Sequence, residues 1–150
     1  MAESTFAYVT YIRTSPEGLW SALTDAETMK RYWFGTWCES TWTPGSSWKM
    51  WYPDGRMTDD GVILEAEPPR RMVIQWTHQL RPELKAEGES RCTIELEPAG
   101  AAVKLSITHT IRRERSELIK AVSVGWPMIL SNLKSVLEIG TPILDRVAAA

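Results

Sequence analysis

The longest regular pattern of hydrophobic and polar positions in this chain lies near its C-terminus, between Ser116 and Leu137. Apolar residues that recur at i, i+3, i+4 and i+7 are typical of a helix with one buried face. Pro127 falls on the opposite, polar side, and Gly140 with Pro142 supplies a stop signal. The pattern predicts one long helix whose apolar arc consists of Leu118, Ile119, Val122, Gly125, Trp126, Ile129, Leu130, Leu133, Val136 and Leu137.

Upstream of this helix the pattern changes to short segments rich in alternating apolar and polar residues, which is typical of strands with one buried face. Turn signals such as Pro53-Asp54-Gly55 and Pro98-Ala99-Gly100 separate them, and Gly61 is expected to mark a bulge. The expected strands are Phe6–Arg13, Trp37–Trp42, Ser47–Tyr52, Arg56–Glu67, Arg71–His78, Arg91–Glu97 and Val103–Ile111.

Two short helices are expected after the first strand. Ser15-Pro16 supplies an N-cap and a proline at the first helical position. Thr24-Asp25-Ala26-Glu27 has capping-box spacing and begins a second helix that ends near Arg31. The polar segment Gln79–Glu89 is expected to be the longest loop, and Val147–Ala150 are expected to fray.

The order of elements is therefore β-α-α-β-β-β-β-β-β-α, which indicates an α+β fold in a single domain over residues 1–150. A curved antiparallel sheet of about seven strands is expected to wrap around the long C-terminal helix. Such a helix does not fill the space along its whole length, so we expect a cavity at one end. A mainly apolar pocket with a few polar groups is the default hypothesis for a ligand site.

The strand alternation places both histidines, His78 and His109, on the inward face of the sheet. If Pro98–Gly100 is a tight turn, Ile94 lies near Leu105, and Ser90 lies beside both histidines. The two rings are then about two strand spacings, or ~9.5 Å, apart at one end of the sheet, under the first half of the long helix. The residues predicted to line the pocket there are Met50, Ile74, Trp76, His78, Cys92, Ile107, His109, Leu118, Val122, Trp126 and Ile129.

Composition narrows the class of protein. Apolar residues make up 43% of the 150 residues and charged residues 24%, as in ordinary globular domains, and the net charge of −2 argues against a nucleic-acid surface. The basic run at Arg112 is read as a solvated turn, with an anionic partner as the alternative. Neither a signal peptide nor a membrane-spanning run is recognisable, so we expect a cytoplasmic protein with Cys38 and Cys92 as free thiols.

Several kinds of chemistry are not indicated. The chain lacks nucleotide-binding glycine motifs, a G-x-S-x-G elbow and metal-binding spacings such as C-x-x-C, so we expect no catalytic residues, cofactor or metal. The pair Asp59-Asp60 is read as solvated surface. Burial among apolar groups is expected to make the Cys92 thiol inert. The eight tryptophans are read as core packing and pocket rim rather than a platform for stacking bases.

Each histidine has alternative interpretations that the residues alone leave open. His78 and His109 can simply cap strand ends near water, or they can orient a ligand by a hydrogen bond. A catalytic or metal-binding role is a third possibility, since histidine suits acid–base chemistry near neutral pH. No carboxylate is evident in the sequence that would orient either ring.

Over most of its length the chain resembles bacterial proteins similar to the C-terminal domain of the activator of Hsp90 ATPase (AHSA1-like), in the START-like (SRPBCC, Bet v 1-like) superfamily. The resemblance implies a helix-grip fold and a cavity that relatives use for hydrophobic small molecules. It implies no specific chemistry. The stretches that carry it are Tyr8–Arg13, Leu19–Asp25, Arg31–Gly35, Pro44–Ser46, Gly61–Arg70, Gly125–Pro127 and Leu133–Glu138.

Three functions remain open from the sequence. The first is a non-enzymatic protein that holds a hydrophobic or aromatic small molecule beneath the long helix. The second is a chaperone-related interaction module, similar to an Hsp90 co-chaperone, with Trp37, Trp42 or Trp51 in an exposed apolar patch. The third is an enzyme acting on a bulky ring compound, which predicts that activity depends on His78 or His109.

Overall fold

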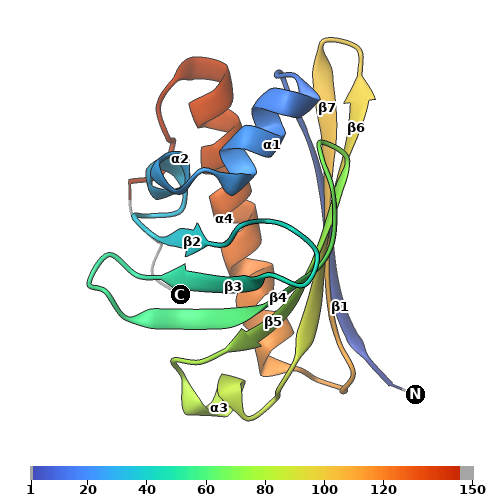
Figure 1. The fold of residues 1–150 in the computed structure, drawn as a ribbon, viewed down its shortest axis with the longest axis vertical. Coiled ribbons are helices and arrows are strands. Elements are labelled where there is room, and N and C mark those ends of the chain that lie inside the picture. The colour runs from blue at the N-terminus through green and yellow to red at the C-terminus, as the bar shows by residue number, and fades with distance from the viewer. Residues whose placement is uncertain (1, 146–150) are drawn as a thin grey trace.

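The structure is a computed structural model that describes residues 2–145. Seven strands form one antiparallel sheet in the order β1-β7-β6-β5-β4-β3-β2, and the sheet curves around the long helix α4 (Figure 1). The elements are β1 (Ser4–Ile12), α1 (Pro16–Thr24), α2 (Ala26–Tyr32), β2 (Trp37–Glu39), β3 (Ser47–Trp51), β4 (Met57–Glu67), β5 (Arg71–His78), α3 (Pro82–Lys85), β6 (Ser90–Ala99), β7 (Ala102–Ile111) and α4 (Glu117–Ile139). The predicted α+β class and helix-grip architecture are confirmed.

Most predicted elements occur close to their expected bounds. The second strand is much shorter than expected, and the expected loop at 79–89 contains the short helix α3, whose Leu84 is buried. Leu84 packs with Ile111, Leu118 and Ile119, which explains why this polar segment folds back onto the domain. The frayed end expected at Val147–Ala150 lies outside the described residues.

The helix ends follow the capping signals with one correction. Ser15 and Ser116 cap α1 and α4 through their side-chain oxygens, and Gly140 ends α4 in the left-handed conformation. The cap of α2 is Asp25, which accepts hydrogen bonds from the backbone and side chain of Thr28. The capping box predicted one position earlier, at Thr24, was therefore wrong.

The predicted strand register between β6 and β7 was wrong by two residues. Ile94 pairs with Ile107 and Cys92 with His109, because the strands continue to the Ala99–Ala102 pair and the turn lies one residue further along than expected. Gly100 supplies the positive φ of that turn, +66°. A shift of two keeps every side chain on its predicted face. The residues predicted to face inward and outward on both strands therefore stay the same.

Gly61 also differs from its predicted role. The register of β4 against β5 shifts between Ile63 and Glu65, so the bulge is at Leu64 and not at Gly61. A Cβ atom on Gly61 would lie 1.6 Å from the carbonyl oxygen of Gln75. Gly61 is therefore required by the close approach of the neighbouring strand.

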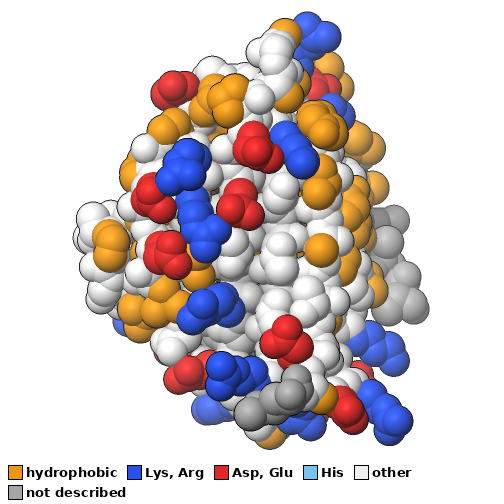
Figure 2. Space-filling model, turned by 90° about the vertical axis from the view of Figure 1, so that its right-hand side faces the viewer, with side chains coloured by type: hydrophobic (Ala, Val, Ile, Leu, Met, Phe, Trp, Pro, Cys, Tyr) orange, Lys and Arg blue, Asp and Glu red, His pale blue; other side chains and the backbone are white. Residues whose placement is uncertain are grey.

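The two faces of the sheet have different roles. The concave face packs on α4, with α1 and α2 towards the C-terminal end of that helix and α3 towards its N-terminal end (Figure 1). The opposite face carries intermingled acidic and basic side chains (Figure 2), among them the ion pairs of Arg71 with Glu65 and Glu95. No helix within residues 2–145 is both long and apolar enough to cross a membrane.

Candidate ligand-binding site

A cavity of about 220 Å³ lies between the N-terminal half of α4, the α3 segment and strands β3 to β5. Most of its wall is aromatic or aliphatic, and Asp59, His78 and Arg81 contribute charged or polar side chains. The lining residues are Trp33, Met50, Tyr52, Asp59, Trp76, His78, Arg81, Leu84, Leu118, Ala121, Val122, Gly125, Trp126 and Ile129.

The structure brings together seven of the eleven residues predicted to line a pocket: Met50, Trp76, His78, Leu118, Val122, Trp126 and Ile129. Ile74 instead lines a much smaller hollow of about 20 Å³, deeper between α4 and the sheet. Cys92, Ile107 and His109 are fully buried core residues that do not line the 220 Å³ cavity. Asp59, Arg81, Tyr52 and Trp33 are lining residues that the sequence did not indicate.

Several aromatic rings pack together between helix and sheet next to the cavity. Trp76 packs against Trp48, with ring centroids 4.5 Å apart, and its edge meets Trp126 at 5.9 Å. Trp33 in turn lies 5.4 Å from Trp126. These rings separate the outer cavity from the small deep hollow, which Trp33, Trp76 and Trp126 also line. The open space is consequently restricted to one end of the sheet.

A second hollow of about 300 Å³ adjoins the first. Both are lined by Trp33, Tyr52, Gly125 and Ile129, and the second adds Phe34, Thr36, Pro53 and Met128. Gly125 lies on α4 where the two meet, and a Cβ atom placed there would contact nothing within 4 Å. The missing side chain at Gly125 therefore leaves room between the hollows.

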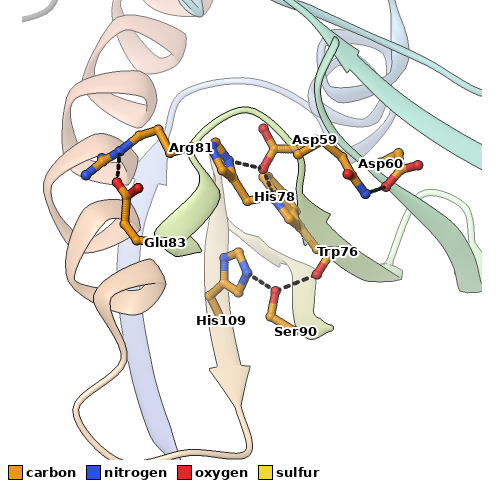
Figure 3. A network of polar contacts seen from close by, with 9 residues as sticks. Asp59, Asp60, Trp76, His78, Arg81, Glu83, Ser90 and His109 are labelled. Carbon is orange, nitrogen blue, oxygen red and sulfur yellow. Dashed lines mark hydrogen bonds and ion pairs between the residues drawn. The ribbon is translucent and has the colours of Figure 1, made fainter. Parts of the chain in front are cut away.

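Asp59 is the centre of a buried polar network on the cavity wall (Figure 3). Its Oδ2 accepts a hydrogen bond from Trp76 Nε1 at 2.7 Å and lies 3.0 Å from His78 Nδ1. The Asp59 residue is only 6% exposed. A buried carboxylate requires such donors, because an unpaired buried charge is costly. A carboxylate oxygen can only accept, so Nδ1 of His78 is the nitrogen that carries a proton towards Asp59.

Strand pairing explains how these side chains meet. Asp59 on β4 is the direct cross-strand partner of His78 on β5, and such pairs have Cβ atoms about 4.5–5.5 Å apart. The interpretation of Asp59 as solvated surface was wrong, as was the expectation that no carboxylate orients a histidine. Counting back in twos from the buried Ile63 through Gly61 places Asp59 on the inward face. That alternation was the available signal.

The other ring nitrogen of His78 is unusual. Nε2 is buried and has no hydrogen-bond partner among the residues that the structure describes. Asp59 lies on the Nδ1 side of the ring, whereas the Arg81 side chain points away from the ring to an ion pair with Glu83 at 2.8 Å (Figure 3). A buried polar atom without a partner costs about 1–3 kcal/mol, so such atoms are rare in folded proteins and require an explanation.

His109 is the opposite case, because both of its ring nitrogens have partners. Trp126 Nε1 donates to Nδ1 at 3.4 Å, and Nε2 lies 2.9 Å from Ser90 Oγ, which donates to the carbonyl oxygen of Trp76. Burial lowers the pKa of His109 to about 4, although the Asp59 carboxylate acts in the opposite direction. His109 is therefore a neutral core residue that holds the tryptophans in place.

The two histidines do not lie side by side as expected. His109 on β7 pairs with Cys92 on β6, and Cys92 pairs in turn with Ile74 on β5. His78 lies four residues beyond Ile74 on the same strand. Trp76 lies between them in the sheet, with its ring 4.9 Å from that of His109. Two of these four residues come from the shifted register of β6 against β7. The other two arise because Ser90 pairs with Trp76 and not, as predicted, with His78.

The remaining reactive groups point to no further site. Cys38 and Cys92 are free thiols, as predicted, and burial raises the pKa of both above the ordinary value. No group of three or more His, Cys, Asp or Glu side chains within residues 2–145 is arranged to hold a metal ion.

Comparison with solved structures shows the same fold in several proteins. The Aha1 dimer from Colwellia psychrerythraea has a TM-score of 0.74 and 21% identity, covering 91% of this chain and 98% of that one. An HSP90 activator from Plasmodium falciparum has a TM-score of 0.70 and 23% identity, covering 89% and 95%. CalU16 from Micromonospora echinospora has a TM-score of 0.72 and 22% identity, covering 90% and 76%.

Comparison with curated protein sequences gave no match. The family model described as Activator of Hsp90 ATPase homolog 1-like protein matches residues 13–138, which include the whole sheet from β2 onwards and nearly all of α4. The chain therefore belongs to the family of Activator of Hsp90 ATPase homolog 1-like proteins.

Proposed function

We propose that this protein binds a small molecule with an aromatic ring in the cavity between α4, α3 and strands β3 to β5, without itself catalysing a reaction. The observation that supports it best is a cavity walled by Trp33, Tyr52, Trp76 and Trp126 whose lining includes His78, the ring of which has a buried Nε2 atom without a partner among residues 2–145. Apolar walls with a few placed polar groups are typical of small-molecule sites.

The size of the cavity limits the ligand. Pockets for small molecules usually measure about 300–1,000 Å³, so the 220 Å³ cavity alone suits a compact ring. A larger ligand would extend past Gly125 into the adjoining hollow of about 300 Å³. Ligands of one to three fused or linked rings are therefore the class to test first.

Substitution of Gly125 tests this proposal. Gly125→Leu places a side chain where the hollows meet, and we expect it to weaken the binding of ring compounds by at least about tenfold (about 1.4 kcal/mol). Binding is measured from the quenching of tryptophan fluorescence with a panel of aromatic compounds.

The matched control is Gly125→Ala. Its Cβ meets nothing within 4 Å, and replacing glycine within a helix should raise the free energy of unfolding by about 0.5–1 kcal/mol. If wild type and Gly125→Leu bind the panel equally, or if wild type binds none of it, the proposal is wrong.

Family membership supports a second candidate, a chaperone-related interaction module with an Hsp90-type partner. Trp37, Trp42 and Trp51, which the sequence suggested for an exposed patch, are half-buried, and the first and last of these stack on each other. The test is titration of a bacterial Hsp90 with this protein while ATP turnover is measured. Unchanged turnover together with no detectable complex would remove this candidate.

A further inference from the structure

The polar network on the cavity wall specifies more than a general apolar ligand. Asp59 Oδ2 accepts from Nδ1 of the His78 ring, so the neutral form of this imidazole has its lone pair on Nε2. Among the described residues no donor reaches that nitrogen. The neutral ring therefore lacks a hydrogen-bond donor at Nε2, and a purely hydrocarbon ligand would leave this atom unsatisfied.

The geometry points to Asp59 and His78 as a proton-accepting pair, and to an aromatic molecule with an acidic hydroxyl group, of the phenol class, as the ligand of the cavity. This inference rests on the proposed function and narrows it. The ligand O–H bond breaks, its proton binds Nε2 of His78, and its electron pair remains on oxygen as a phenolate. The imidazolium so formed donates Nδ1–H to the Asp59 carboxylate, which stabilises it.

The surroundings of the pair fit this assignment. Trp76 donates a second hydrogen bond to Asp59 Oδ2, which holds the carboxylate in place. Aromatic rings of Trp33, Trp76 and Trp126 line the cavity and can stack on an aromatic ligand. Arg81 lines the cavity as well, with its guanidinium paired to Glu83.

His78 is the histidine that carries this role, and His109 is its internal control. Both nitrogens of His109 have partners within the protein, so a ligand has nothing to add there. The chain contains only these two histidines. Their ring nitrogens are therefore readily distinguished in a long-range ¹H–¹⁵N spectrum.

The experiment uses 4-nitrophenol and its methyl ether, 4-nitroanisole, which has the same ring but no hydroxyl proton. We expect wild type to bind the phenol at least about tenfold more tightly than the ether, because only the phenol satisfies Nε2. At a pH where the free probe is neutral, the bound phenol should show the phenolate absorption band. In the ¹⁵N spectrum Nε2 of His78 should become protonated while the His109 signals stay unchanged.

Variants of Asp59 and His78 form the second part of the experiment. Asp59→Asn and His78→Phe should abolish the phenolate band and reduce the preference for the phenol to about equal affinity for both probes. Circular dichroism and thermal unfolding establish that each variant is folded. If a variant is unfolded, the wild-type comparison of the two probes and the ¹⁵N spectrum decide without it.

Several charged or titratable groups near His78 affect the pH at which the phenolate band appears. These are Asp59 on β4, Arg81 and Glu83 in the α3 segment, and Tyr52 after β3, whereas α4 contributes apolar residues to the cavity.

The outcomes separate the two proposals. Equal affinity of wild type for phenol and ether, with no phenolate band, would overturn the assignment of the proton-accepting pair and leave the binding function intact. Absence of binding for both probes and for the wider aromatic panel would overturn the binding function and this inference together.

Discussion

Single residues show how differently two histidines are used on one sheet. His109 was expected to line the pocket, but both of its nitrogens are bonded within the core. His78 is held by Asp59 on one side, and on the other side no residue in the described range 2–145 is its hydrogen-bond partner. The inward strand face was predictable for both histidines, because side chains alternate along a strand. Their partners were not, because they come from other strands.

The pKa of His109 predicts how stability changes with pH. Burial lowers this pKa from its ordinary 6.5 to about 4. Between these values the unfolded chain binds a proton at His109 and the folded protein does not, so the free energy of unfolding should fall as the pH drops from about 6.5 to about 4. The loss from this residue is about 3 kcal/mol, and none is added at lower pH.

Urea unfolding of wild type and His109→Asn across this pH range measures the effect. The difference between the two pH profiles isolates His109, because Asn has no titrating ring. Parallel profiles would show that His109 is not a neutral buried histidine in the folded protein.

At the scale of elements, the N-terminus of α4 depends on a residue from another segment. Glu87, just after α3, accepts hydrogen bonds from the hydroxyl of Ser116 and from the backbone N–H groups of Glu117 and Leu118. Burial raises the pKa of Glu87, but these hydrogen bonds outweigh it and hold the pKa below the ordinary value. The carboxylate therefore joins the α3 segment, which covers the cavity, to the first turn of α4.

Glu87→Gln tests this link. Loss of the charged cap should lower the free energy of unfolding by about 1 kcal/mol, as for other helix caps. Because the pKa of Glu87 is lowered by folding, its contribution is present above the ordinary pKa of 4.5 and is lost as the pH falls through the lower folded value. The free energies of unfolding of wild type and Glu87→Gln, measured by chemical denaturation, should therefore differ at neutral pH and become equal in acid. An unchanged difference in acid would contradict the charged role.

At the scale of the whole molecule, tryptophan rings determine how much of the helix-grip interior stays open. Trp126 lies between Trp33 and Trp76 and separates the deep hollow of about 20 Å³ from the outer cavity. The size of these side chains restricts the open cavity to the end near α3.

Trp126→Ala should therefore lower the free energy of unfolding by about 3–5 kcal/mol and join the two spaces, so that ligands larger than those of wild type are accepted. Chemical denaturation and fluorescence titration measure the two effects. Trp51→Ala is the matched control, because Trp51 is half-buried and stacks only on Trp37 among the aromatic rings. If both substitutions lowered the free energy of unfolding by the same amount, a central role for Trp126 would be contradicted.

Features that depend on residues close in the chain could be predicted from the sequence. The period of apolar residues, the cap at Ser15 and the stop at Gly140 were enough to predict the elements and the α+β helix-grip fold, because they depend on residues close in the chain. Seven cavity residues were likewise predictable from the strand and helix faces.

Only the tertiary structure decided the register of β6 against β7, the pairing of Asp59 with His78, and the place of the open cavity. Register depends on where a turn forms, and one residue there moves every cross-strand contact by two. The cavity depends on which rings fill the interior. The long helix α4 was evident from the sequence by itself, whereas the chemistry beneath its first turns arises from strands β4 and β5 being brought together by folding.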